Sequence, residues 1–194
     1  MSSYDSPQGS QPTTPRFRVG DALIVSGGAF VFLFSFLPFV SYSDELRGPI
    51  ERSGFGIWFN AWQAQTFMAP LTWFVILAAV TAGGLSVANY VLKQPITLLK
   101  FSAPQLQVIT SMFAFVTLLG YATSAKSVVF GSNYAQYLGD KAFTNGIDFG
   151  VGGYLMLVFA LLCSVGTLMN LYDIGPTLFS RSSKATAAPT VSQR

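Results

Sequence analysis

The sequence of 194 residues is 51% hydrophobic and only 10% charged, and its formal net charge is +3. A typical soluble domain carries about 25% charged residues, so the composition excludes an ordinary soluble protein and indicates a membrane domain. There is no histidine, and the only cysteine is Cys163, which removes the histidine-dependent catalytic triads, the usual zinc ligands and any disulfide within the chain. We therefore expect a protein that is not an enzyme and that uses no metal or other cofactor.

Both ends of the chain have the composition of polar tails. Residues 1–20 are rich in Ser, Pro, Gln and Thr, and a segment with so few large apolar groups cannot offset the entropy lost on ordering. Residues 176–194 are rich in Ser, Thr and Ala. We predict disordered cytoplasmic tails over 1–20 and 176–194, and a single membrane domain over 21–175.

Four long runs without a charged residue lie between the tails, at 22–43, 53–92, 101–125 and 149–172. About 20 apolar residues in an α-helix cross a hydrocarbon core roughly 30 Å thick. The runs therefore predict transmembrane helices near 22–42, 67–91, 104–125 and 150–172. The expected fold class is an all-α membrane protein, a bundle of four transmembrane helices with two long outer loops.

The distribution of basic residues predicts the orientation. With both termini in the cytoplasm, seven of the 11 basic residues lie inside and four lie outside, in agreement with the positive-inside rule. These residues are scattered singly or in pairs, so their pattern indicates no nucleic-acid partner. We expect a multi-pass protein of the plasma membrane, whose partners are the lipid bilayer and either other membrane proteins or further copies of itself.

Ionisable residues are absent from the predicted spans. Inside a bilayer such groups mark ion paths and proton relays, but Asp21, Asp148 and Asp173 stand at the predicted helix ends, where water can solvate them. Uncharged polar side chains remain within the spans, and we expect them to form hydrogen bonds between helices. They include Thr81, Ser86 and Asn89 in the second predicted helix, Thr110, Ser111 and Thr117 in the third, and Ser164, Thr167 and Asn170 in the fourth.

The outer half of the first predicted helix is crowded with phenylalanine, including Phe36, and Pro38 stands close to its end. Alternating phenylalanines do not share one helical face, so lipid contact together with packing inside the bundle explains them. A groove for an acyl chain or for a partner helix is the alternative. Pro38 is expected to end or kink the helix.

Two tryptophans, Trp58 and Trp62, stand in the first outer loop. Their spacing of four places both indoles on one side of a helical turn. Tryptophan favours the membrane interface because its ring is apolar while its N–H needs a partner. An aromatic belt at the membrane surface explains the pair, and a binding site for a ligand or a protein is the alternative.

Small residues gather in the second predicted helix, where Ala79, Gly83 and Gly84 are candidates for a helix contact. Small residues four apart let two backbones approach closely. The contact is either a surface for self-association or packing inside the bundle, and the sequence leaves both open.

Two short segments of the chain have nearly the same sequence, and we call this internal similarity the echo. The residues Gly-Ile-Trp-Phe at 56–59 precede the second predicted helix, and Gly-Ile-Asp-Phe at 146–149 precede the fourth. The echo indicates either a duplicated helical hairpin, since parallel repeats occur in membrane proteins, or chance.

The stretch 34–48, Phe-Ser-Phe-Leu-Pro-Phe-Val-Ser-Tyr-Ser-Asp-Glu-Leu-Arg-Gly, resembles a group of small actinobacterial four-helix membrane proteins, which includes mycobacterial membrane antigens with long Pro/Gln-rich tails. In that group the first helix likewise ends at a Pro-aromatic step followed by a Ser, acid, Leu, Gly stretch. This chain departs from the group in its short C-terminal tail. The group has no established chemistry, so the resemblance implies a cell-envelope setting in a Gram-positive actinobacterium.

The leading functional hypothesis is an integral membrane protein without enzymatic activity that serves as an accessory or scaffold component of cell-envelope complexes. The alternative is a small oligomeric transporter, channel or lipid-binding membrane protein. The candidate interaction residues are Trp58, Trp62, Ala79, Gly83, Gly84, Phe36 and Pro38.

Overall fold

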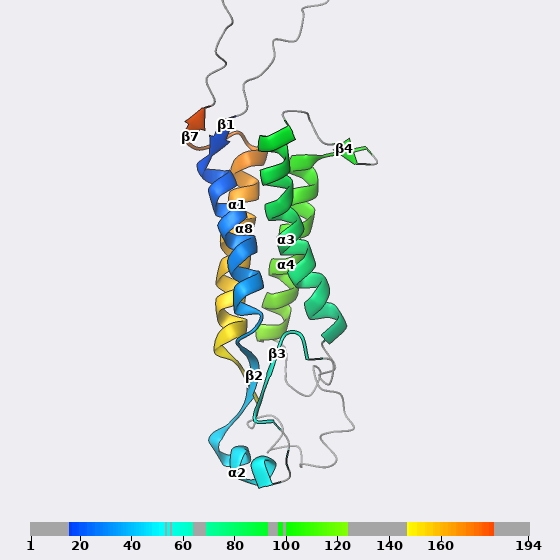
Figure 1. The fold of residues 1–194 in the computed structure, drawn as a ribbon, viewed down its shortest axis with the longest axis vertical. Helices are drawn as coiled ribbons and strands as arrows, with labels where there is room; N and C mark the ends of the chain where they lie inside the picture. The colour runs from blue at the N-terminus through cyan, green and yellow to red at the C-terminus, as the bar shows by residue number, and fades with distance from the viewer. Residues whose placement is uncertain are drawn as a thin grey trace, which may run out of the picture.

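A computed structural model describes residues 16–52, 54, 56–63, 69–92, 97–98, 100–123 and 147–180. Over these residues the protein is mainly helical (Figure 1). Its long helices are α1 (Val19–Phe34), α3 (Ala69–Leu92), α4 (Ala103–Thr123) and α8 (Val151–Leu171). A shorter helix, α2 (Asp44–Arg52), lies beyond the end of this bundle.

The long helices pack side by side in a ring. Helix α1 contacts α3 and α8, and α4 contacts the same two helices from the other side. Successive long helices run in opposite directions along the bundle (Figure 1). Each helix therefore has one stripe facing the interior and a broad face directed outward.

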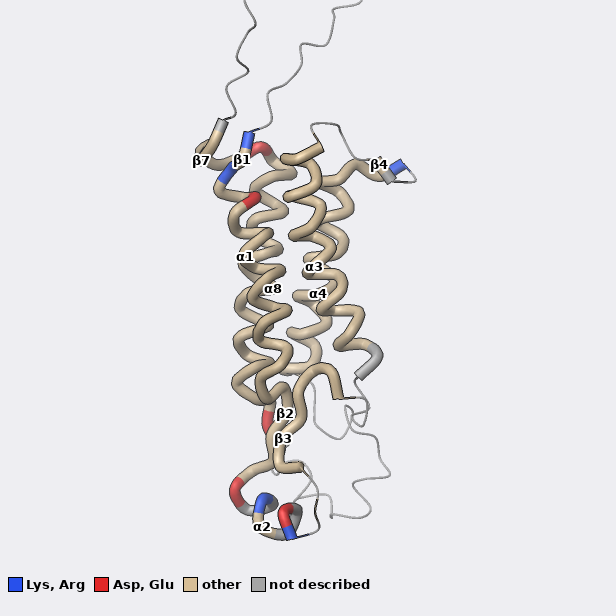
Figure 2. Tube along the Cα trace, in the orientation of Figure 1, with Lys and Arg blue, Asp and Glu red and all other residues tan. Residues whose placement is uncertain are grey.

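Three of the helices are long and apolar enough to cross a membrane, by length and composition, over 71–92, 103–123 and 151–171. The remaining long helix, α1, has 16 residues, a length of about 24 Å at 1.5 Å per residue, which is less than the roughly 30 Å of a hydrocarbon core. Figure 2 shows charged residues at the two ends of the bundle and an uncharged zone between them.

The first predicted helix, over 22–42, is wrong at its C-terminal end. Helix α1 stops at Phe34, and after a turn the chain continues as strand β2 (Pro38–Tyr42). The cause is Pro38, which has no N–H to donate and whose ring would clash with the carbonyl of Phe34 in a continuous helix. The residue before a proline is also driven out of the helical region.

Strand β2 is the centre of a small antiparallel sheet, with β3 (Trp58–Asn60) on one side and β6 (Ile147–Phe149) on the other. Val40 of β2 pairs with Phe59 and with Phe149. Ser41 pairs with the preceding residue of each outer strand. The two echoed segments thus pair with β2 in the same register on its opposite edges, and the duplication itself stays a prediction.

The opposite end of the bundle is closed by a two-stranded ribbon of β1 (Arg16–Arg18) and β7 (Thr177–Ser180). Residues 16–20 and 176–180 are therefore ordered, contrary to their prediction as parts of disordered tails. The reason is pairing between distant segments, including a backbone hydrogen bond of 3.2 Å from Val19 N–H to the Pro176 carbonyl. The remainder of both predicted tails, 1–15 and 181–194, lies outside the described residues.

Strands β4 (Thr97–Leu98) and β5 (Phe101–Ser102) form a second short ribbon between α3 and α4. The interior of the bundle is filled by apolar side chains that are entirely or almost entirely buried. They include Val31, Val75, Ile76, Leu118 and Met156.

Glycine brings α1 and α8 close together. A Cβ added at Gly27 would lie 2.7 Å from the Cβ of Cys163 and 2.9 Å from the carbonyl oxygen of Phe159. A Cβ added at Gly166 would lie 2.7 Å from the carbonyl oxygen of Gly20. The two backbones approach so closely that no side chain fits between them, which is the packing that small residues permit in membranes.

Candidate functional site

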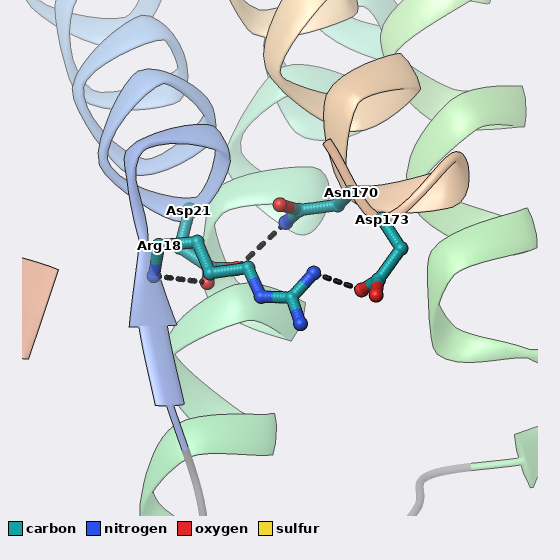
Figure 3. A network of polar contacts seen from close by, with 4 residues as sticks. All are labelled: Arg18, Asp21, Asn170 and Asp173. Atoms are coloured by element: carbon teal, nitrogen blue, oxygen red, sulfur yellow. Dashed lines mark hydrogen bonds and ion pairs between the residues drawn. The ribbon is translucent and has the colours of Figure 1, made fainter. Parts of the chain in front are cut away.

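The carboxylate of Asp21 lies among three helices at the end of the bundle that carries β1 and β7. Its Oδ2 accepts the backbone N–H of Arg18 at 3.0 Å, and its Oδ1 accepts Nδ2 of Asn170 at 2.7 Å (Figure 3). The hydroxyl of Ser86 donates to the same Oδ1 at 3.2 Å. Asp21 is half-buried, and side chains of α3 and α8 donate hydrogen bonds to it. The prediction that water solvates Asp21 at a helix end is therefore incomplete.

The polar contacts continue inward from Asp21. Gln107 of α4 is only 2% exposed, and its Nε2 donates to the Ser86 hydroxyl at 2.8 Å. One turn deeper, the hydroxyls of Ser111 and Thr167 lie 2.9 Å apart and share a hydrogen bond. Every long helix contributes to this polar cluster, which consists of Asp21, Ser86, Gln107, Ser111, Thr167 and Asn170.

An ion pair lies beside the polar cluster. The guanidinium of Arg18 contacts the carboxylate of Asp173 (Figure 3), and because the Asp173 side chain is 78% exposed such a pair contributes about 0–1 kcal/mol. Asp173 has a φ of 60°. It is the left-handed residue of a Schellman turn that ends α8, in which Ile174 N–H donates to the Met169 carbonyl at 2.8 Å.

The oxygen of the Asn170 amide, Oδ1, is buried and has no hydrogen-bond partner among the described residues. This oxygen occupies the place where a Cβ on residue 20 would stand. Gly20 therefore provides the room in which the Asn170 side chain turns its Nδ2 toward Asp21.

An aromatic cluster, made of Phe32, Phe36, Trp62 and Trp73, lies at the opposite end of the bundle, where α1 gives way to β2. The ring of Trp62 has its centroid 5.9 Å from that of Phe36, 6.2 Å from Phe32 and 6.3 Å from Trp73. Its Nε1 donates a hydrogen bond of 2.6 Å to the hydroxyl of Ser35. The indole N–H of Trp62 thus points into the protein, whereas a residue of an aromatic belt directs it to water or headgroups.

Ala61, next to Trp62, is hydrogen-bonded to the end of α1 and to α3. The backbone N–H of Ala61 donates to the Ser35 carbonyl at 3.1 Å, and the hydroxyl of Thr72 donates to the Ala61 carbonyl at 2.8 Å. Trp58 lies elsewhere, in strand β3, and is 42% exposed. The expectation that both indoles share one side of a helical turn is therefore wrong, because residues 58–60 pair with β2 instead of forming a helix.

The predicted small-residue contact divides between the interior and the surface. Ala79 and Gly83 are buried against α1, where a Cβ on Gly28 would lie 2.5 Å from the Ala79 carbonyl oxygen. Gly84 is exposed, and a Cβ added to it would meet nothing within 4 Å. Packing inside the bundle thus accounts for Ala79 and Gly83, and Gly84 alone faces outward.

Of the predicted interaction residues, the structure brings Phe36 and Trp62 together in the aromatic cluster, and Ala79 and Gly83 together against α1. Pro38 starts β2 and is half-buried.

The sequence analysis did not single out Gln107, although a glutamine four residues before Ser111 in an uncharged run was a usable signal. Within the described part of the chain, no three His, Cys, Asp or Glu side chains are grouped to hold a metal ion.

Comparison with known proteins returned no matching family model, no matching curated protein and no matching solved structure. The class of protein therefore rests on the fold. The chain is a mainly helical, membrane-associated protein with three helices that are able to span a bilayer by length and composition.

Proposed function

We propose that the chain is an integral membrane protein without enzymatic activity, and that it serves as an accessory or scaffold component of cell-envelope complexes. The observation that supports this role most is the inward direction of its polar groups. Members of the polar cluster form hydrogen bonds with one another across four helices, and large apolar side chains are exposed on the outward helix faces. Such a surface is suited to contact with lipids and with other transmembrane helices.

Helix α4 illustrates the outward surface. Phe113, Val116 and Leu119 are all exposed on it, although apolar groups of this size would be buried in a soluble bundle. In a bilayer they contact acyl chains or the side chains of a neighbouring protein. A scaffold needs no more than this kind of surface.

The depth of the polar cluster favours a scaffold over a channel formed by one copy of the chain. The cluster reaches inward as far as Ser111 and Thr167. Beyond them, Val31, Leu118 and Met156 are fully buried in the interior. A polar path through a single bundle would have to cross this apolar layer, so a transporter or channel would need a path between several copies.

In the proposed arrangement the protein crosses the plasma membrane four times, with both termini in the cytoplasm. Strand β2 would complete the first crossing, because α1 alone is too short. Backbone that is not helical is tolerated at membrane depth when protein surrounds it and satisfies its hydrogen bonds. Phe39 and Val40 of β2 are buried, and the Phe39 carbonyl accepts the Gly150 N–H at 2.7 Å.

Cysteine accessibility tests this orientation. In a Cys163→Ser background, Glu51→Cys in α2 should react with an impermeant thiol reagent added to intact cells. Thr97→Cys, at the other end of the bundle, should react only after the cells are opened. Labelling of Thr97→Cys in intact cells, with protection of Glu51→Cys, would reverse the proposed orientation.

The scaffold role is tested by crosslinking in cells followed by purification of the tagged protein in mild detergent. A partner protein recovered in fixed stoichiometry is the expected result. A matched variant, Phe36→Ala, reports whether the aromatic cluster contributes to that contact, and Gly84→Ala serves as the control on another outward face. A homo-oligomer with bound lipid or measurable flux favours the transporter alternative, and a monomer with neither contradicts both functions.

A further inference from the structure

Four large apolar side chains are exposed just beyond the last transmembrane helix. Tyr172 is 69% exposed, Ile174 58%, Leu178 46% and Phe179 65%. All of them follow Leu171, the last residue of α8, so they do not belong to the helical surface that faces acyl chains. So dense a group of apolar side chains outside a span indicates a contact surface.

The ribbon of β1 and β7 exposes apolar groups on both of its faces. Leu178 and Phe179 are consecutive residues of β7, and successive side chains of a strand point to opposite faces. The ring of Phe179 lies 6.4 Å from that of Phe17, whose other neighbour is Tyr90 at 5.5 Å. A contact with one flat protein surface would cover one face only, whereas the lipids of a bilayer interface surround the ribbon and contact both faces.

The length of the ribbon limits its distance from the bilayer. Strand β1 has three residues and leads directly into α1, so it extends about 10 Å at most beyond that helix. The polar headgroup layer is about 5–8 Å thick on each side of the hydrocarbon core. A ribbon of this length, attached to the starts and ends of spanning helices, therefore lies at the depth of the headgroups.

The charged residues in and beside the β1/β7 ribbon also fit a position in the headgroup layer. Arg16 is exposed on β1, and arginine commonly extends its charged group from apolar surroundings toward phosphate. Arg18 is paired with Asp173, and Asp21 is turned into the bundle by Ser86 and Asn170. The nearby carboxylates are thus engaged with the protein, which leaves Arg16 to face the phosphate groups of lipids.

We propose that the β1/β7 ribbon is a membrane-interface anchor, seated in the phospholipid headgroup layer, with Leu178 and Phe179 inserted at the hydrocarbon boundary and Arg16 directed to lipid phosphate. The anchor fixes the depth of α1 and α8 in the bilayer. It rests on the proposed membrane location, and it is independent of which protein the scaffold contacts.

Fluorescence quenching in phospholipid nanodiscs tests the anchor. Thr177→Cys, in the Cys163→Ser background, places an environment-sensitive fluorophore in β7 beside Leu178. Val116→Cys on the outward face of α4 and Glu51→Cys in α2 provide the bilayer and water references. Spin-labelled lipids and aqueous iodide serve as the two quenchers.

The fluorophore at residue 177 should be quenched by lipids spin-labelled near the headgroup, and quenched by iodide several-fold less than the one at residue 51. Adding Leu178→Ser and Phe179→Ser should raise its iodide quenching toward the value at residue 51. Equal iodide quenching at residues 177 and 51 overturns the anchor and assigns the ribbon to water or to a missing protein partner. Protection that survives the double substitution overturns the role of the two side chains.

The reference at Val116 separates failure of the anchor from failure of the membrane location. If lipid quenches the fluorophore at residue 116 but not at residue 177, the helices are in the bilayer and the anchor is wrong. If lipid quenches neither, the membrane location itself is wrong.

Discussion

Asn170 donates a hydrogen bond of 2.7 Å from its Nδ2 to the Oδ1 of Asp21, although the two residues are 149 positions apart in the sequence. The bond joins the start of the first long helix to the end of the last. Ser86 donates to the same carboxylate oxygen from α3. The carboxylate therefore organises three helices at one end of the bundle.

Asp21→Ala is expected to destabilise the protein because Ser86, Asn170 and the Arg18 N–H all lose their acceptor at once. Hydrogen bonds to a charged group contribute about 1.5–3 kcal/mol in water-soluble proteins, but interhelical bonds in membranes average about 0.6 kcal/mol. We expect a loss of about 1–3 kcal/mol, measured by thermal unfolding in detergent. Thr81→Ala, on the exposed face of α3, is the control, and equal stability of the two variants contradicts the role of Asp21.

Gly27→Ala should destabilise the bundle, because the new Cβ would stand 2.7 Å from the Cβ of Cys163. Overpacking of this kind costs typically about 1–3 kcal/mol. Gly84→Ala is the matched control, since its Cβ meets nothing within 4 Å and alanine favours a helix by about 1 kcal/mol over glycine. Unfolding by denaturant should show opposite signs for the two variants, and destabilisation by both would mean that Gly84 also faces a neighbour.

Trp62→Phe should lower the free energy of unfolding by about 0.5–1.5 kcal/mol, because Ser35 loses the indole N–H that donates to its hydroxyl at 2.6 Å. Trp58→Phe is the comparison, because Trp58 is exposed in β3. Chemical unfolding of both variants measures the difference. The interpretation of Trp62 as an internal anchor is refuted if Trp58→Phe proves to be the more destabilising change.

Asp173→Gly and Asp173→Ala separate backbone strain from charge at the end of α8. Both variants lose the ion pair with Arg18, but only glycine adopts a φ of 60° without a steric cost. The alanine variant should be less stable than the glycine variant by about 1 kcal/mol. Thermal unfolding checks this order, and the reverse order would show that the left-handed turn does not form.

The positions of the long helices could be predicted because runs without charge are a local property of the sequence. The end of α1 could be predicted only in part: Pro38 was expected to end or kink the helix, but the uncharged run continues to Ser43 and favoured a helix as far as residue 42. The sheet depends on pairing of β2 with strands that begin at residues 58 and 147. No hydropathy pattern specifies such a register.

The polar cluster was predictable in kind but not in arrangement. Ser86, Thr167 and Asn170 stood out as polar residues within apolar runs, and hydrogen bonding between helices was the expected role. The contacts of Ser86 and Asn170 with Asp21, and of Thr167 with Ser111, depend on the rotation and relative height of four helices, which the sequence does not reveal. Phe36 and Trp62 were both expected at the outer end, but their contact depends on Ser35 and on the turn that follows α1.

Strand β2 is the central strand of its sheet, and its two neighbours, β3 and β6, are separated from each other in the sequence by α3 and α4. During synthesis β3 emerges soon after β2, whereas β6 follows only after α3 and α4 have been made. One edge of β2 therefore stays without its partner strand until only α8 and the residues after it remain to be made. This small sheet can therefore be completed only after α1, α3 and α4 have been made.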